Sequence, residues 1–238
     1  MASTSTAPHL VRARIVGIRR ETPRVSVFWL EYGAQPYRFR PGQWIDLYAS
    51  PAGRREVGGY SITSTASTPG RIRIAVKHSD MHPVTRWLSR SAKVGDYVEV
   101  SEGQGDFHYD PAHGERLVLL AAGIGITPLF GILCEIYETR PEVAATLLYG
   151  AASLAELLFR AELDAMASAR ANIRCLYAVT GKGHAGEGRV LELLDRGGAV
   201  DTGATYYFCG PRGCVDDLVR ALPARGVPEE RLVYERWW

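Results

Sequence analysis

The chain has 238 residues and an ordinary hydrophobic content, which is enough for the cores of one or two domains. Its formal net charge of +2 predicts no nucleic-acid or membrane partner, and no apolar run reaches the roughly 20 residues of a membrane-spanning helix. Its four cysteines have neither iron–sulfur nor zinc spacing, and the N-terminus lacks an apolar secretory segment, so we expect a metal-free, cytoplasmic monomer with reduced thiols.

The first half of the chain contains short segments rich in β-branched and aromatic residues, separated by glycine, proline and polar residues. These segments are typical of strands and cover residues 11–20, 25–32, 43–49, 58–63, 71–77 and 96–101. One helix is expected over about residues 83–91. Many short, evenly spaced strands are typical of a sandwich or barrel, so we expect an antiparallel β-barrel domain over residues 9–112.

The second half of the chain has a different pattern. Continuous apolar segments at residues 117–123 and 145–152 are typical of parallel strands buried on both faces. Helices are expected over residues 128–139 and 153–169, and the alternation continues through residues 172–180, 188–195, 205–210, 215–226 and 231–238. Alternation of strand and helix predicts an α/β domain with a doubly wound parallel sheet over residues 113–238.

A glycine turn follows the first strand of this second domain. Gly123 and Gly125 come directly after the strand, and Pro128 fits the first turn of the helix that follows, with Thr127 as its N-cap. Such glycines let a backbone approach a pyrophosphate, which the helix N-terminus then attracts. The alternative is a tight turn without a ligand, since the spacing is not that of the G-x-G-x-x-G pattern.

A second turn, Cys209-Gly210-Pro211, follows another buried strand. Ligands of open α/β sheets bind at the carboxyl ends of the strands, so Gly123 and Cys209 are expected to face one crevice. The Cys209 thiol is either a small buried hydrophobic group or an active-site contact. No histidine or lysine adjoins it in the sequence to activate it as a nucleophile.

Six motifs occur in an order that resembles the ferredoxin–NADP reductase superfamily, and most closely its oxidoreductase NAD-binding domain-containing protein subgroup. The motifs are PGQWIDLY, GGYSITS, IRIAVKHSDMHPVTRWL, LVLLAAGIGITPL, FCGPRG and YERWW. The resemblance covers about residues 10–238. It implies an FAD-binding β-barrel domain followed by an NAD(P)-binding α/β domain.

The resemblance implies a role for each motif. Tyr60 would pack on the flavin ring, the Ser61 hydroxyl would reach flavin N5, and Cys209 would lie beside the nicotinamide. Glu235 would support that site, and Trp237 or Trp238 would cover one flavin face, although a tryptophan there is also a plausible anchor for the last strand. The remaining flavin contacts would be Ala75, Val76, Lys77, His82, Pro83 and Thr85. The remaining nicotinamide contacts would be Gly123, Ile124, Gly125, Thr127, Pro128, Gly150, Ala151, Gly210, Pro211 and Gly213.

The flavin motifs depart from the superfamily pattern at two positions. Gly58 stands where the motif has an arginine that contacts the flavin phosphate, and His82 stands where the pyrophosphate motif has a glycine. Arg54, Arg55 or Arg86 either replaces the missing arginine or is a solvated surface charge. We expect FAD as the cofactor, with FMN as the alternative, and the departures leave the affinity open.

The resemblance implies a flavin-dependent NAD(P)H oxidoreductase that passes a hydride from NAD(P)H to flavin and then electrons to a separate acceptor. The acceptor is a small redox protein, a monooxygenase component, or a free flavin, quinone or oxygen. Two rival functions are a non-catalytic flavin or nucleotide sensor and an electron-transfer subunit of a larger complex. The intact Tyr60-Ser61, Cys209 and Glu235-x-Trp237 favour the enzyme, because a sensor needs no hydride-transfer residues.

Charged residues bear on the choice of nucleotide and acceptor. The segment 150–153 offers no cation for a 2′-phosphate, which favours NADH over NADPH, with Lys182 and Arg189 as later candidate donors. Positive charge in the first half would either steer an acidic protein partner or form an ordinary solvated surface. The residues that carry this charge are Arg71, Arg73, Lys77, Arg90 and Lys93.

Overall fold

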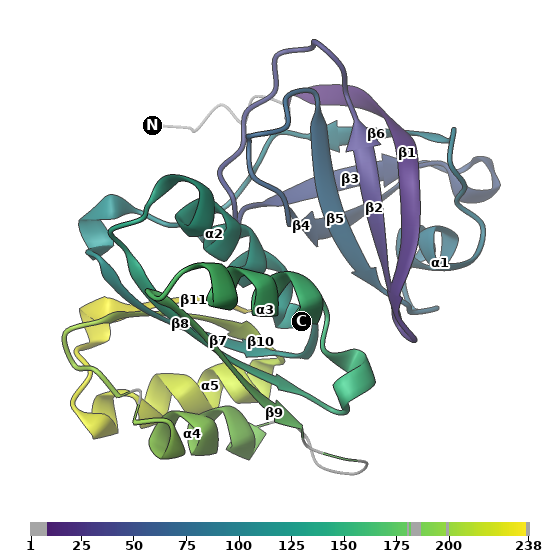
Figure 1. Ribbon diagram of the computed structural model, residues 1–238. Coiled ribbons are helices and arrows are strands. Elements are labelled where there is room, and N and C mark those ends of the chain that lie inside the picture. The colour runs from purple at the N-terminus through teal and green to yellow at the C-terminus, as the bar shows by residue number, and fades with distance from the viewer. Residues whose placement is uncertain (1–8, 180, 182–186, 199, 237–238) are drawn as a thin grey trace, which may run out of the picture.

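The computed structural model describes residues 9–179, 181, 187–198 and 200–236. The chain forms two domains that lie side by side, an antiparallel sheet near the N-terminus and a parallel sheet with helices after it (Figure 1). No helix in the described ranges is long and apolar enough to span a membrane.

The N-terminal domain is a six-stranded antiparallel sheet in the order β4-β3-β6-β1-β2-β5. Its strands are β1 Leu10–Thr22, β2 Val25–Glu31, β3 Trp44–Ala49, β4 Glu56–Ser61, β5 Arg71–Lys77 and β6 Tyr97–Ser101. A bridge between Ile62 and Ile74 joins the end of β4 to β5, the two edges of the sheet, and so curls the sheet into a barrel. One helix, α1 (Pro83–Arg90), follows β5.

Alternating side chains build the barrel interior. In β3, Ile45, Leu47 and Ala49 are buried, whereas the residues between them are half-buried, as the period of two in a strand requires. These residues belong to a core to which every strand contributes, and α1 adds Val84 and Leu88 to it. The end of this barrel formed by β4, β5 and α1 faces the second domain.

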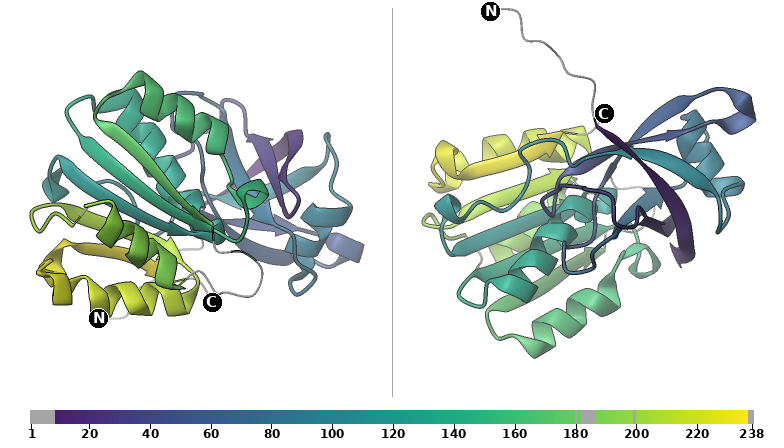
Figure 2. Two further views of the ribbon diagram at one scale, coloured as in Figure 1. Left: turned by 60° about the horizontal axis from the view of Figure 1, so that its bottom comes forward. Right: turned by 90° about the horizontal axis from the view of Figure 1, so that it is seen from above.

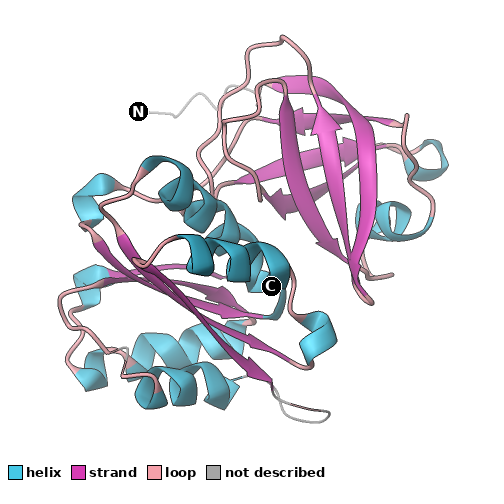
Figure 3. Ribbon diagram, viewed as in Figure 1, coloured by secondary structure: helices cyan, strands magenta, loops and turns pink. Residues whose placement is uncertain are grey.

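The C-terminal domain is a parallel sheet in the order β11-β10-β7-β8-β9. Its strands are β7 Arg116–Ala122, β8 Ala144–Ala151, β9 Ile173–Val179, β10 Thr205–Gly210 and β11 Leu232–Arg236. Helices cover both faces of the sheet (Figure 3). Its helices are α2 Ile126–Thr139, α3 Arg160–Ala169, α4 Glu187–Arg196 and α5 Arg212–Ala221. One core lies under α2 and α3, and another lies under α4 and α5.

The order of the strands creates a switch point. The chain runs from β7 outward to β8 and β9, and then returns to place β10 on the other side of β7. The loops after β7 and β10 therefore leave the sheet in opposite directions, which opens a crevice at the carboxyl ends of these two strands. Gly123 follows β7 there, and Cys209 is near the end of β10.

Two helix predictions were wrong at their boundaries. The helix expected from Pro128 begins at Ile126, and Thr127 is inside its first turn, where its hydroxyl donates to the Ile124 carbonyl at 2.9 Å, so Thr127 is not the N-cap. The helix expected over residues 153–169 is split into a short 3-10 turn, Leu154–Glu156, and α3. The split occurs because Phe159 has a left-handed backbone with φ of 61°, which no regular α-helix contains.

The two domains share a core along α2. Val25, Val27 and Ala75 of the barrel belong to the same buried cluster as the residues under α2. The backbone of α2 approaches the barrel so closely at Gly131 that an added Cβ would lie 2.7 Å from the Ile62 carbonyl oxygen. Figure 2 shows this side-by-side packing from two further directions. An apolar, close-packed boundary of this kind limits how far the two domains can move relative to each other.

Candidate active site

A cleft of about 560 Å³ lies between the barrel and the switch point of the parallel sheet. The barrel wall of the cleft consists of Arg24, Gly59, Tyr60, Ser61, Ala75, Val76, Lys77, His78, Ser79 and Thr85. The opposite wall consists of Gly123, Ile124, Gly125, Thr127, Cys209, Gly210 and Pro211. The cleft therefore brings together most of the residues that the two sets of motifs singled out.

Tyr60 fixes the barrel wall to helix α1. Its hydroxyl lies 2.9 Å from the Thr85 hydroxyl, and burial raises the pKa of Tyr60 to about 12, so the phenol is neutral at physiological pH. The ring covers Gly58, where an added Cβ would lie 2.7 Å from the Tyr60 hydroxyl oxygen. In this conformation of Tyr60 any side chain at position 58 would be obstructed, which accounts for glycine in place of the motif's arginine.

Gly58→Ala is expected to lower the free energy of unfolding by about 1–3 kcal/mol, because the new methyl group displaces the Tyr60 ring and breaks its hydrogen bond to Thr85. Urea unfolding followed by circular dichroism measures this loss. In a Tyr60→Phe background the same substitution should cost less, since the nearest clashing atom is gone. Equal costs in the two backgrounds would show that Tyr60 does not constrain position 58.

The opposite wall is a turn of backbone with little side-chain cover. Gly123 has φ of +56°, and an added Cβ there would meet nothing within 4 Å, so this position faces open space. Gly125 is confined instead, because its Cβ would lie 2.2 Å from the Cys209 carbonyl oxygen. The α2 N-terminus, with its free N–H groups and positive dipole end, begins directly after this turn.

Parallel pairing places Cys209 beside Glu235. The two residues are register partners near the carboxyl ends of β10 and β11, and Cys209 lines the cleft whereas Glu235 does not. Cys209 is 2% exposed. Burial, and after it the charge of Glu235, raise the pKa of the Cys209 thiol far above its usual range. The thiol is therefore protonated at neutral pH and acts by packing rather than as a nucleophile.

If the cleft binds the flavin and the nicotinamide nucleotide that the motifs predict, the rate at which NADH reduces the flavin should show no thiol ionisation step between about pH 6 and pH 9, because the raised pKa of Cys209 lies above this window. Anaerobic stopped-flow measurements across this range give the profile. Cys209→Ala should give a profile of the same shape. An alkaline step that appears in the wild type and vanishes in Cys209→Ala would mean that Cys209 ionises during turnover.

Comparison with known proteins agrees with this geometry. Residues 16–109 match the sequence model of the oxidoreductase FAD-binding domain, and residues 119–220 match that of the oxidoreductase NAD-binding domain. The Xenopus laevis protein called Oxidoreductase NAD-binding domain-containing protein 1 is 30% identical, over 100% of this chain and 86% of its own length. The chain belongs to this family of FAD- and NAD-binding oxidoreductases.

Two solved structures share the two-domain fold, and a further relative is similar in sequence. The FAD/NAD-binding domain of nitric oxide dioxygenase from Vibrio cholerae superposes with a TM-score of 0.83 at 28% identity, over 95% of this chain and 98% of that one. A ferredoxin reductase of carbazole 1,9a-dioxygenase superposes with a TM-score of 0.81 at 21% identity, over 98% of this chain and 71% of that one, and shows the fold alone. One component of the 1,2-phenylacetyl-CoA epoxidase of Escherichia coli is 32% identical over 85% of this chain and 60% of its own length.

The residues of the cleft fit the two cofactors of this oxidoreductase family. Small residues on both walls, among them Ala75 and Gly123, leave room for flat rings between the domains. Arg24 and Lys77 supply positive charge at the cleft, which suits the phosphates of a dinucleotide. The Ser61 hydroxyl lines the cleft and has no hydrogen-bond partner among the described residues, so it is available to a ligand.

Several positions taken from the family motifs do not line the cleft. Pro83 begins α1, and His82 precedes it with no capping hydrogen bond from its side chain. Gly150 packs against Val190, and Ala151 lines a smaller adjoining cavity. Pro128 is buried in the first turn of α2, and Gly213 is in the first turn of α5. Trp237 and Trp238 lie outside the described residues, as does Lys182.

The sequence analysis also missed residues that line the cleft: Arg24, Gly59, His78 and Ser79. His78 follows Lys77 directly, so its place in the IRIAVKHSD motif was a usable signal. Its ring Nε2 lies 2.8 Å from the Ser26 hydroxyl, and burial together with the charge of Arg20 lowers the pKa of His78. His78 is therefore neutral at physiological pH and contributes a hydrogen-bonding group rather than a charge.

The arginines suggested as phosphate contacts do not line the cleft. Arg54 pairs with Glu56, and Arg55 pairs with Glu99 on the barrel surface. Arg86 is exposed and is absent from the lining of the cleft. Arg24 and Lys77 are the cations among the lining residues, so they are the better candidates to replace the missing arginine.

Pairing also removes much of the basic surface that the sequence suggested. Arg71 pairs with Glu31, Arg73 with Glu162, and Arg90 with Asp80. Three of the five cations proposed to steer an acidic partner are thus neutralised by a carboxylate. Lys77 lies at the cleft itself.

Proposed function

We propose that this chain is a flavin-dependent NAD(P)H oxidoreductase in which a hydride passes from NAD(P)H to bound FAD and electrons then pass to a separate acceptor. The observation that carries this proposal is the cleft, because one space is walled by the flavin-motif residues Tyr60 and Ser61 and by the nicotinamide-motif residues Gly123 and Cys209. A sensor of either ligand alone would not need both walls to face each other.

FAD, when bound, supplies the N5 atom that accepts a hydride and can release electrons singly or in pairs. The chain's own residues would hold the reactants and exclude water. The Ser61 hydroxyl, buried except toward the cleft, would donate a hydrogen bond to N5. The neutral Cys209 thiol would pack beside the nicotinamide, and Glu235 on the neighbouring strand would support that side. Holding two reactants in near-attack contact can lower a barrier by about 7–11 kcal/mol.

NADH is the proposed nucleotide. The residues after β8 offer no cation to a 2′-phosphate. Arg24 lines the cavity beside the end of β8, but Glu156 lines the same cavity and pairs with it at 3.8 Å, so this cation is partly offset by a carboxylate. The side chain of Arg189, the other candidate donor, is not described.

The acceptor is proposed to be a separate protein component, and the protein is proposed to act in the cytoplasm. The spacing of the four cysteines in the sequence is not that of an iron–sulfur site, so the electrons would leave the flavin for a partner rather than for a cluster held by this chain. The Escherichia coli relative is one component of an epoxidase, which supports a protein acceptor.

Anaerobic titration tests the proposed function. The purified chain is loaded with FAD, and NADH or NADPH is added while the absorbance of oxidised flavin is followed. The expected result is bleaching by one equivalent of NADH, with slower bleaching by NADPH. A chain that binds no flavin, or a bound flavin that neither nucleotide bleaches, contradicts the proposal.

A further inference from the structure

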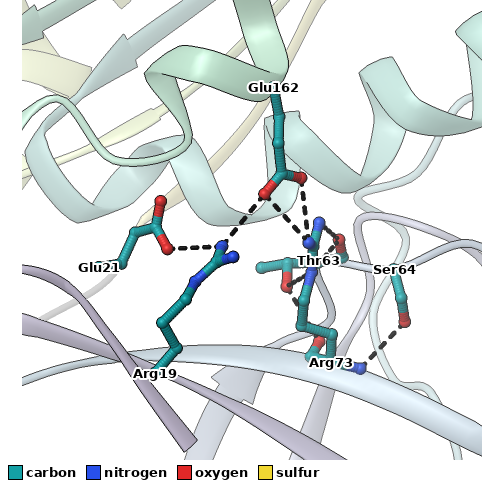
Figure 4. Close-up of polar contacts among 6 residues, drawn as sticks. All are labelled: Arg19, Glu21, Thr63, Ser64, Arg73 and Glu162. Atoms are coloured by element: carbon teal, nitrogen blue, oxygen red, sulfur yellow. Dashed lines mark hydrogen bonds and ion pairs between the residues drawn. The ribbon is translucent and has the colours of Figure 1, made fainter.

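An ion pair between a largely buried arginine and a half-buried glutamate crosses from the barrel to the C-terminal domain. Arg73 of β5 donates through Nη1 to Oε2 of Glu162 at 3.0 Å, and Glu162 belongs to the first turn of α3 (Figure 4). The Arg73 side chain is 14% exposed and the Glu162 side chain is 35% exposed, so the guanidinium is held within the boundary while water reaches the carboxylate. Arg19 adds a second, more exposed contact to Glu162 at 3.3 Å. Arg73 is therefore the principal barrel partner of α3.

The barrel fixes the direction of the Arg73 side chain. Its Nε donates to the Thr63 hydroxyl at 3.2 Å, and its Nη2 donates to the Thr63 carbonyl at 2.9 Å. The backbone N–H of Arg73 donates to the Ser64 hydroxyl at 3.0 Å. The guanidinium thus points at α3 before any contact across the boundary is counted, which lowers the entropy lost when it pairs with Glu162.

The Arg73 guanidinium packs over two aromatic rings of the C-terminal domain. The Arg73 guanidinium carbon lies 4.9 Å from the centre of the Phe130 ring and 5.0 Å from that of Phe159, and these rings stack on each other at 4.1 Å. Phe159 is the residue with the left-handed backbone. Such a conformation persists in a bulky residue only where its surroundings over-determine it, and here the stack and the cation do so.

Short segments connect the cleft to the contact of Arg73 with Glu162, Phe130 and Phe159, which we call the junction. Ser61 of the cleft is two residues from Thr63, and Ala75 is two residues from Arg73, which is about 7 Å along a strand. On the other side of the cleft, α2 directly follows the turn Gly123–Gly125 and reaches Phe130 within about one helical turn. The gap across the cleft therefore cannot change without moving the residues of the junction.

We propose that the Arg73–Glu162 pair, which packs on Phe130 and Phe159, positions the two walls of the cleft against each other. It thereby sets the gap between the barrel wall and the opposite wall across which the hydride is transferred. This inference rests on the proposed function of the cleft. Arg73 and Glu162 touch neither reactant, and they act as positioning residues through the segments that carry Ser61 and the α2 turn.

The kinetic test compares Arg73→Leu and Glu162→Gln with Arg71→Leu. Arg71 is a matched control, because it lies on the same strand and pairs with Glu31 at 2.8 Å without leaving the barrel. Anaerobic stopped flow gives the limiting rate of flavin reduction and the NADH concentration at half that rate. Both junction variants should lower the limiting rate at least about 10-fold and change the half-saturating concentration less than about 3-fold, because misplacement affects the transition state more than binding. Arg71→Leu should behave as wild type.

A second measurement reports the distance between the two domains and does not depend on turnover. Spin labels at Met81→Cys in the barrel and Leu154→Cys in the C-terminal domain use two exposed sites, whereas the native cysteines are buried or half-buried. Electron paramagnetic resonance should show a longer or broader distance distribution in Arg73→Leu and an unchanged one in Arg71→Leu.

The positioning role requires both results, and the absence of either overturns it. A normal wild-type rate with equal rates in Arg73→Leu and Arg71→Leu removes the positioning role alone. Failure of NADH to reduce the wild-type flavoprotein removes the proposed function, and the two failures are therefore distinguishable. Glu162→Gln leaves the hydrogen bonds from Arg73 to Thr63 in place. A lower rate in this variant therefore cannot be attributed to misfolding of the barrel around Arg73.

Discussion

Replacing Gly125 with alanine is expected to reduce the rate of flavin reduction by NADH more than about 100-fold. The added Cβ would lie 2.2 Å from the carbonyl oxygen and 2.4 Å from the carbonyl carbon of Cys209, and backbone cannot yield as a flexible side chain does. The turn that contains Gly125 must therefore move away from the end of β10. This movement separates the two segments that form the opposite wall of the cleft. The same overpacking should lower the free energy of unfolding by about 3 kcal/mol.

Gly114→Ala is the matched control for this substitution. Gly114 lies in the loop before β7 in the same domain, has φ of +85° and would place its Cβ in open space. Its substitution should cost about 1–3 kcal/mol, because a φ of 85° with a ψ of −173° is a backbone conformation that essentially only glycine adopts, and should leave the reduction rate unchanged. Stopped-flow reduction and urea unfolding, measured on both variants, separate the two effects. A Gly125→Ala protein with a wild-type rate would show that the contact between the turn and β10 is not needed for nicotinamide binding.

The close contact at Gly125 illustrates what the sequence can and cannot predict. A glycine turn between a buried strand and a helix indicates a nucleotide site, and the switch-point rule then brings Gly123 and Cys209 to one crevice. The pairing of Cys209 with Glu235 is seen only in the structure, because neither the order of the strands nor their register can be read from local patterns. The prediction of one crevice depends only on where the buried strands end, which local patterns do encode.

Features that depend on how the domains dock were not predictable from local patterns. Arg73 was interpreted as one of several surface cations, yet it is largely buried against α3, because its partner is 89 residues away in the chain. The break at Phe159 has no sequence signal, since left-handed backbone is usually a property of glycine or asparagine. Likewise, glycine at position 58 became intelligible only when the Tyr60 ring was found lying over it.

Ser61→Ala is the second substitution with a large expected effect. The Ser61 side chain is buried by the barrel, lines the cleft and has no partner among the described residues, so its hydroxyl can be directed wholly at a bound group. Removing one preorganised hydrogen-bond donor from a site of this kind lowers a rate by about 100-fold or more. We therefore expect the limiting rate of flavin reduction to fall by about that factor, with little change in the free energy of unfolding.

Ser61→Thr separates the hydroxyl from the shape of the side chain. Threonine keeps the donor and suits a strand end, so its rate should stay within about 3-fold of wild type. Pre-steady-state reduction by NADH, with flavin content measured for each variant, distinguishes lost hydride transfer from lost flavin. If Ser61→Ala with full flavin content is reduced as fast as Ser61→Thr, the hydroxyl does not act on the flavin, and the barrel wall contributes only by holding the ring in place.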